Sequence, residues 1–189
     1  NRGQSSNDVI PTVIHLGAAM ALSESLLPAL KELIETISRK AADVGETVKT
    51  GRTHLMDAMP VTLGQEMGAW RTQLEDAVTR LQRCRPRLHA LAQGGTAVGT
   101  GVNANPQFAP KVAALLSQET GLDLRPARDF FAALASQDTA VELSGHLRTL
   151  AVALVKISKD LRWMTSGPRA GLAEISLPAL QPGSSIMPG

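Results

Sequence analysis

The chain has 189 residues, of which 43% are hydrophobic, and this is enough apolar material for the core of a single domain. Aromatic residues make up 3% and Tyr is absent, while Ala and Leu are abundant, so the composition favours packed helices over sheets. A net charge of +2 gives no broad basic surface for nucleic acid, and the single Cys84 excludes an intrachain disulfide and a thiolate zinc site.

These limits predict one all-α domain, a bundle of long helices that spans residues 1–189. The chain begins at Asn1 without a Met and stops at Gly189 within a loop-like stretch, so we expect a domain truncated at both ends. No uninterrupted apolar run approaches the roughly 20 residues of a membrane-spanning helix, and no membrane partner is expected. The single thiol indicates a reducing compartment, taken as the cytoplasm with the mitochondrion as the alternative.

The first predicted helix opens directly after Ser5 and Ser6. Asn7 or Asp8 can cap it, and Pro11 is tolerated because the first helical turn needs no internal N–H donor. Apolar residues then recur at three- and four-residue intervals, as one face of an amphipathic helix requires: Ile10, Val13, Ile14, Gly17, Ala18 and Leu22.

A second helix is predicted from a similar apolar stripe, which consists of Leu26, Leu30, Leu33, Ile37, Ala41 and Val44. Pro28 fits only in the first turn of this helix, and Gly45 is expected to end it. Residues 48–60 lose the periodicity and gain Gly, Thr, Asp and Pro, which is typical of an ordered loop between helices. This loop contains the segment GRTHL, residues 51–55.

Two long helices are predicted in the remaining chain. The first continues past Pro86 to a glycine-rich turn at residues 94–101, and its stripe consists of Leu63, Met67, Trp70, Leu74, Val78 and Leu81. The second has the seam of a helix packed along its neighbours: Leu143, Leu147, Leu150, Leu154, Ile157, Leu161 and Met164. Further apolar residues widen this seam, which predicts a bundle that extends into other subunits.

Three segments place small polar side chains between the apolar helices: Ser5-Ser6-Asn7, Thr53-His54 and Ser184-Ser185. A helix N-terminus offers free backbone N–H groups and a positive dipole end, so the first segment suits a substrate carboxylate. Simple N-capping is the alternative that the spacing alone favours. On composition alone, the two serines near the end belong to an ordinary flexible loop.

His54 is the one histidine outside a predicted helix, since His15, His89 and His146 fall within helical patterns and suit packing or surface positions. It is therefore the acid/base candidate. No other His or carboxylate stands at metal-ligand spacing from it, so no metal site is predicted. The stretch GGTAVGTG lacks the ending and the preceding strand of a phosphate loop, which predicts a turn and no nucleotide cofactor.

Six motifs occur in one order along the chain: SSND from Ser5, GRTHL from Gly51, TLGQE from Thr62, GGTAVGTG from Gly94, SGPR from Ser166 and GSSIMPG from Gly183. Together they resemble the fumarase/aspartase superfamily, and the whole chain is similar to its class II fumarase branch. Aspartate ammonia-lyases usually have Ser-Thr-Asn where this chain has Ser5-Ser6-Asn7, which favours the fumarase branch.

The resemblance implies a homotetramer with active sites shared among three subunits, which interconverts the dicarboxylates L-malate and fumarate without a cofactor. It implies Ser184 as the base at carbon 3 of malate, and His54 as the group that acts through water on the departing hydroxyl. The substrate carboxylates would be held by Ser5, Ser6, Asn7, Thr53 and Ser185. The family places a Lys and an Asn just after the serine motif, beyond Gly189.

The chain departs from the family pattern at several positions. Arg2-Gly3 stands where Met-Ser is usual, Gln137 where His is common, and Met56 where Gln is common. Loss of a polar side chain at Met56, beside the segment with His54, predicts weaker support or a changed rate. An aspartate ammonia-lyase or related dicarboxylate lyase is the alternative enzyme, and an inactive structural fragment is the alternative outside enzymes.

Overall fold

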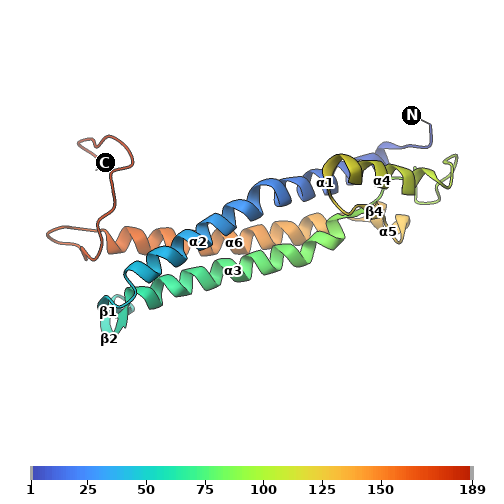
Figure 1. The fold of residues 1–189 in the computed structure, drawn as a ribbon. Helices are drawn as coiled ribbons and strands as arrows, with labels where there is room; N and C mark the ends of the chain where they lie inside the picture. The colour runs from blue at the N-terminus through green and yellow to red at the C-terminus, as the bar shows by residue number, and fades with distance from the viewer. Residues whose placement is uncertain (1, 188–189) are drawn as a thin grey trace.

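The computed structural model describes residues 2–187, so the predicted domain 1–189 is seen without its first residue and its last two. Three long helical rods lie side by side, with a small lobe at one end and a hairpin at the other (Figure 1). The predicted bundle of long helices is confirmed for these rods. The expectation of an all-α chain is corrected, because two short two-stranded sheets are also present.

The first rod is one continuous helix of 38 residues, where the sequence predicted two helices. It consists of α1 (Ser6–Ala21), the π-helical η1 (Leu22–Leu26) and α2 (Leu27–Asp43). At the joint, the N–H of Leu27 donates to the carbonyl of Leu22, five residues back. Pro28 follows directly and lacks an N–H, and its ring would clash with an α-helical carbonyl four residues earlier. The wider π turn removes this conflict, so the helix continues.

This rod is also, among residues 2–187, the one helix long and apolar enough to cross a membrane by length and composition. Its most apolar window has a mean hydropathy of 1.5, and 17% of that window is buried in the chain. The prediction from uninterrupted apolar runs did not anticipate it, because small and polar residues are scattered through the helix. The central helices of soluble bundles have the same composition. The exposed apolar surface of this rod is therefore equally suited to contact with further helices.

The other two rods are α3 (Leu63–Leu88) and α6 (Asp138–Met164), both of which the sequence predicted. A capping box between Thr62 and Gln65 starts α3, and the helix continues past Pro86 as expected. Buried residues recur at heptad-like spacing, namely Leu63, Trp70, Leu74, Ala77, Leu81, Cys84 and Leu88 in α3, and Leu143, Leu150, Ile157 and Met164 in α6. This spacing keeps a seam of α3 against its neighbours α2 and α6.

Residues 48–62, predicted mostly as a loop, form an antiparallel hairpin of β1 (Val48–Thr53) and β2 (Met56–Thr62). Gly51 and Pro60 misled the prediction because both residue types are rare inside strands. Gly51 sits at an irregularity of the pairing, where an added Cβ would lie 2.5 Å from a carbonyl oxygen of the opposite strand. Pro60 is tolerated because a two-stranded hairpin leaves both outer edges unpaired.

The lobe at the other end contains the predicted glycine-rich turn and four short elements that were not predicted. These are β3 (Ala90–Leu91), α4 (Phe108–Thr120), β4 (Arg125–Pro126) and α5 (Phe130–Ala135). Gly94 in the turn has a φ of +110°, and a Cβ there would lie 2.5 Å from the Cβ of Ala109. Glycine therefore lets α4 pack closely against the turn.

Candidate active site

The N-terminus of α1 is capped by Ser5, not by Asn7 or Asp8 as the sequence predicted. The Ser5 Oγ accepts from the Asn7 N–H at 3.2 Å, and the Ser5 N–H donates to the Asp8 Oδ1 at 2.9 Å. This reciprocal capping box confirms the N-capping interpretation for Ser5 and makes Asp8 its second member. Ser6 and Asn7 are exposed on the first turn of the helix.

Asp8 also fixes the glycine-rich turn, a role that the sequence analysis missed. Its side chain is fully buried, and Oδ2 accepts from the backbone N–H groups of Gly94 at 3.0 Å and Thr96 at 2.9 Å. The Asn7 Nδ2 donates to the carbonyl of Ala97 at 2.8 Å. The spacing of Ser5 and Asp8 was a local signal for the capping box. The contacts of Asp8 with Gly94 and Thr96 had no such signal, because these residues lie almost 90 positions away in the sequence.

Thr53 and His54 lie at the tip of the hairpin. Thr53 pairs with Met56 at the end of the ladder, and His54 and Leu55 form the two-residue turn with φ values of +50° and +64°. Two positive φ angles are the geometry of a type I′ turn, which favours Asn and Gly and is strained for Leu. His54 is exposed at this turn, and Met56, two positions further along the chain, is 70% exposed.

Ser184 and Ser185 are exposed in the irregular segment after α6, as the sequence predicted for a loop. The Ser184 Oγ accepts from the N–H groups of Met187 at 3.1 Å and Ile186 at 3.3 Å. The Ser184 N–H donates to the Met187 carbonyl at 2.6 Å, which closes a tight turn. Two backbone donors therefore converge on this hydroxyl oxygen, while its own O–H donates to the Met187 carbonyl at 3.4 Å. The last two residues of the GSSIMPG motif lie outside the described residues.

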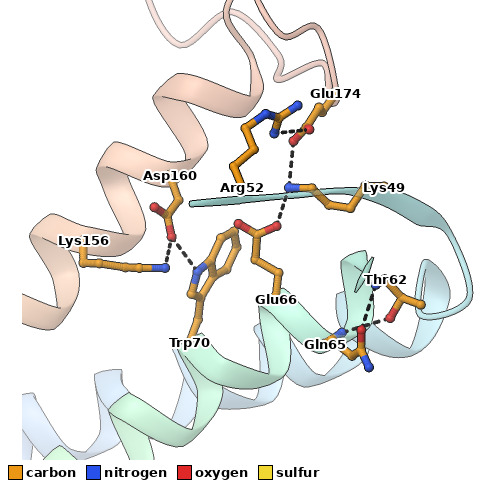
Figure 2. Close-up of polar contacts among 9 residues, drawn as sticks. All are labelled: Lys49, Arg52, Thr62, Gln65, Glu66, Trp70, Lys156, Asp160 and Glu174. Carbon is orange, nitrogen blue, oxygen red and sulfur yellow. Dashed lines mark hydrogen bonds and ion pairs between the residues drawn. The ribbon is translucent and has the colours of Figure 1, made fainter. Parts of the chain in front are cut away.

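A charged cluster holds strand β1 of the hairpin, and Figure 2 shows its four members: Lys49, Arg52, Glu66 and Glu174. Lys49 pairs with Glu66, and its Nζ lies 2.8 Å from the Glu174 Oε2. The Arg52 Nη1 lies 2.6 Å from the Glu174 Oε1. Only 9% of the Lys49 side chain and 11% of the Glu174 side chain are exposed, so the cluster is a largely desolvated link between β1, α3 and the segment after α6.

Burial and pairing act in opposite directions on the cluster. Burial would lower the pKa of Lys49, but hydrogen bonds with Glu174 and Glu66 outweigh it and raise that pKa above the usual value. Burial would raise the pKa of Glu174, but hydrogen bonds from Lys49 and Arg52 lower that pKa below its usual value. Both groups are therefore held in their charged forms at neutral pH.

A second polar contact fixes α6 beside this cluster. The Asp160 Oδ2 accepts from the Trp70 Nε1 at 3.0 Å and also pairs with Lys156, as Figure 2 shows. A cavity of about 450 Å³ lies between this contact and the hairpin, and Leu55 is among its lining residues. The hairpin, α3 and α6 thus all contribute residues to the walls of this cavity.

The three predicted polar segments do not meet within one chain. The N-terminus of α1 lies at the lobe end of the rods, whereas the hairpin and the end of α6 lie at the opposite end (Figure 1). The continuous first helix has 38 residues, which corresponds to a length of roughly 57 Å. A site that contains residues from both ends therefore requires more than one copy of the chain.

The other three histidines take the packing or surface positions that the sequence predicted. The His15 Nδ1 lies 2.9 Å from the Ala90 carbonyl oxygen, His89 is 8% exposed, and His146 lies 3.5 Å from Glu142. Burial, followed by the nearby Arg85, lowers the pKa of His89, so it is neutral at pH 7. Within residues 2–187, no three His, Cys, Asp or Glu side chains are placed to hold a metal ion.

Comparisons with known proteins extend over the whole chain. A sequence profile described as lyase matches residues 1–189. A class II fumarate hydratase of Pseudomonas aeruginosa is 60% identical, and one of Xylella fastidiosa is 57% identical, each over 100% of this chain. The alignments cover 41% and 40% of those relatives, so the chain spans about two fifths of their length.

The fold agrees with the sequence match. The crystal structure of recombinant class II fumarase from Schistosoma mansoni superposes with a TM-score of 0.96 at 41% sequence identity. The superposition covers 100% of this chain and 43% of that one. The motif resemblance, the full-length profile match and the shared fold agree, and the chain belongs to the lyase family that includes the class II fumarate hydratases.

Proposed function

We propose that this chain supplies the central helical part of a class II fumarate hydratase, which interconverts L-malate with fumarate and water. The observation that carries the proposal is 60% identity, along the whole chain, to a relative that bears this name. The activity is proposed for the gene product that contains the chain. We also propose that the protein works in the cytoplasm, with the mitochondrion as the alternative compartment. Its reaction would be a step of the tricarboxylic acid cycle.

Ser184 acts as the base in this proposal. In its deprotonated form the Ser184 oxygen takes the proton from carbon 3 of malate and becomes a hydroxyl, and the electron pair of the broken C–H bond is delocalised into the neighbouring carboxylate. That pair then forms the double bond of fumarate as the C–O bond at carbon 2 breaks. The N–H groups of Ile186 and Met187 support this role, because they stabilise the deprotonated oxygen.

His54 acts on the opposite face, through a water molecule that gives a proton to the departing hydroxide. Its strained turn supports this role, since left-handed non-glycine residues cluster at functional sites. The substrate carboxylates are held by Ser5, Ser6, Asn7, Thr53 and Ser185. The capping role of Ser5 is compatible with binding, because its oxygen accepts in the cap while its O–H proton can be donated to the carboxylate.

The protein also forms a homotetramer with shared sites in this proposal, and the separation of the two ends supports the sharing. Its contact surface is proposed on the apolar residues that one chain leaves open. On α6, Val141, Val152 and Val155 are 70%, 65% and 52% exposed, and on α1, Ile10 and Val13 are 56% and 58% exposed. An apolar stripe opposite the buried seam is typical of a helix that has a second partner.

The reaction is tested by ultraviolet absorbance of the gene product offered L-malate, with L-aspartate in a parallel cuvette. Fumarate formed from malate alone is the expected result. Fumarate formed from aspartate alone would assign the protein to the ammonia-lyases, with Met56 as a first candidate for the change of substrate. No absorbance change in either cuvette would reject the hydratase.

Variants at the two proposed catalytic residues test the mechanism. Ser184→Ala is expected to lower kcat by at least about 100-fold, and His54→Asn by a similar factor, as loss of a general base or acid does. Ser38→Ala removes a helix-surface hydroxyl, and His146→Asn removes a histidine from α6, so these two serve as matched controls. Full activity of Ser184→Ala would exclude this residue as the base.

A further inference from the structure

The turn that carries His54 has little packing of its own. Thr53, His54 and Leu55 are exposed at the tip of a two-stranded hairpin, and such a hairpin is only marginally stable by itself. Its side-chain attachment is the charged cluster along β1, which extends from Lys49 near the base of the hairpin to Arg52, the residue directly before Thr53. The position of the turn therefore depends on what holds Arg52.

Glu174 is the group that holds it. Its carboxylate accepts from Arg52 through Oε1 and faces Lys49 through Oε2, so one side chain contacts two cations of the same strand. The two cations point toward Glu174 from β1, as Figure 2 shows. Because one carboxylate binds two residues of the same strand, it restrains both the distance of β1 from Glu174 and the rotation of β1 about its own axis.

The backbone of Glu174 is itself anchored. Its N–H donates to the Met164 carbonyl at 2.8 Å, and the Ala173 N–H donates to the Ser166 carbonyl at 2.7 Å. Met164 is the last residue of α6, one of the three rods, and Ser166 follows it by two positions. A continuous chain of contacts thus runs from α6 through Glu174 and Arg52 to the turn.

We propose that Glu174 is a positioning residue, whose carboxylate fixes the Thr53–His54 turn against the end of α6 and so sets where His54 meets the substrate. This inference rests on the proposed function, because it assigns His54 a substrate. Glu174 itself does not touch the reacting atoms. It acts through Arg52, in the way that outer residues orient the groups of an active site.

The test uses Glu174→Gln, Glu174→Asp and Arg52→Gln in the gene product that contains the chain, with L-malate as substrate. Glu174→Gln is expected to lower kcat about 10- to 100-fold, with KM changed less than about threefold. Glu174→Asp keeps the negative charge, so its kcat should be higher than that of Glu174→Gln. We expect the decrease in log kcat to be smaller by at least about a third. The double variant with Arg52→Gln should be no slower than the worse single variant, within about threefold, because both remove one link.

The control is Glu35→Gln, which removes an exposed carboxylate from a pair with Lys31 at 3.9 Å and should leave kcat unchanged. A merely structural role would lower the amount of folded enzyme and leave kcat per active site unaltered. Wild-type kcat in Glu174→Gln, or a loss that Glu174→Asp does not relieve at all, would overturn the inference.

A second readout separates this inference from the proposed function. Hydrogen–deuterium exchange of the peptide around residues 52–56 is expected to speed up in Glu174→Gln and to stay unchanged in Glu35→Gln. If the wild-type protein turns over neither malate nor aspartate, the proposed function fails, and the exchange rates alone then decide whether Glu174 fixes the turn. Unchanged exchange in Glu174→Gln would overturn the positioning role whatever the activity.

Discussion

At the lobe end of the rods a buried carboxylate is satisfied by backbone N–H groups, whereas at the hairpin end two carboxylates and two cations neutralise one another. Asp8 accepts from its own cap and from the glycine-rich turn, and no ion pair involves it within residues 2–187. Lys49, Arg52 and Glu174 instead depend on mutual charge. The first arrangement fixes backbone directly, and the second fixes flexible side chains that in turn hold the backbone.

The comparison predicts that the lobe end is the more sensitive to loss of one carboxylate. Asp8→Ala leaves three backbone donors without an acceptor in a buried place, and is expected to lower the free energy of unfolding by about 3–5 kcal/mol. Urea denaturation measures the loss. Asp43→Ala, in an exposed pair with Lys40, is the control and should stay within about 0.5 kcal/mol of the wild type. Equal losses in both variants would contradict the comparison.

At the hairpin end, Glu174→Gln should cost less than Asp8→Ala. Lys49 keeps Glu66 as a partner and the amide still fills the space, so we expect a loss of about 1–2 kcal/mol in the same urea experiment. A loss as large as that of Asp8→Ala would show that the ion pairs are no more replaceable than the backbone contacts.

The charged cluster at the hairpin end should lose its contribution to stability in acid. The pKa of Glu174 is lowered, so its pairing contributes stability above its ordinary pKa of 4.5, and this is lost as pH falls through the lower folded value. The pKa of Lys49 is raised, so its contribution persists below 10.5 and is lost only at higher pH. The Tm difference between wild type and Glu174→Gln should be constant from pH 6 to 9 and shrink below about pH 4. A difference that grows in acid would reverse the assignment.

The smallest expected effect concerns the tip of the hairpin. Leu55→Gly relieves a left-handed conformation and should raise the free energy of unfolding by about 0.5 kcal/mol, after the extra freedom of glycine in the unfolded chain is subtracted. Met59→Gly places the same residue inside β2, at an equally exposed position, and should lower stability by about 1 kcal/mol. Urea denaturation measures both changes in the free energy of unfolding. Changes of opposite sign would show that the backbone angle decides the effect, whereas a decrease in both variants would show that loss of the side chain does.

The parts of the fold that could be predicted are those whose signal is local and repeated. The seams of α3 and α6 recur every three or four residues, so Leu143, Leu150 and Ile157 identify their helix without knowledge of a partner. The hairpin was missed because Gly51 and Pro60 interrupt its pattern, and the first rod was divided because the π turn that accommodates Pro28 has no sequence period.

The candidate site was predictable as a set of residues and not as an arrangement. The motifs around Ser5, His54 and Ser184 identify a family, but they do not say that Ser5 lies at one end of the rods and the other two motifs at the opposite end. Glu174 had no signal at all, because it meets Arg52 across 122 positions of sequence. Contacts of that separation depend on how α6 ends, which no local pattern encodes.

The π turn within the first rod has a geometric consequence for the amino-terminal polar segment. A turn with one extra residue advances all following side chains by about 100° around the axis, while the axis itself stays almost straight. As a result α1, which precedes the π turn, contacts α3, α5, α6 and β3, while α2, which follows it, packs its apolar side mainly against α3. Deletion of one residue from 22–26 would shorten the rod by only about 1.5 Å, yet it would swing Ser5, Ser6 and Asn7 roughly a quarter-turn away from the glycine-rich turn.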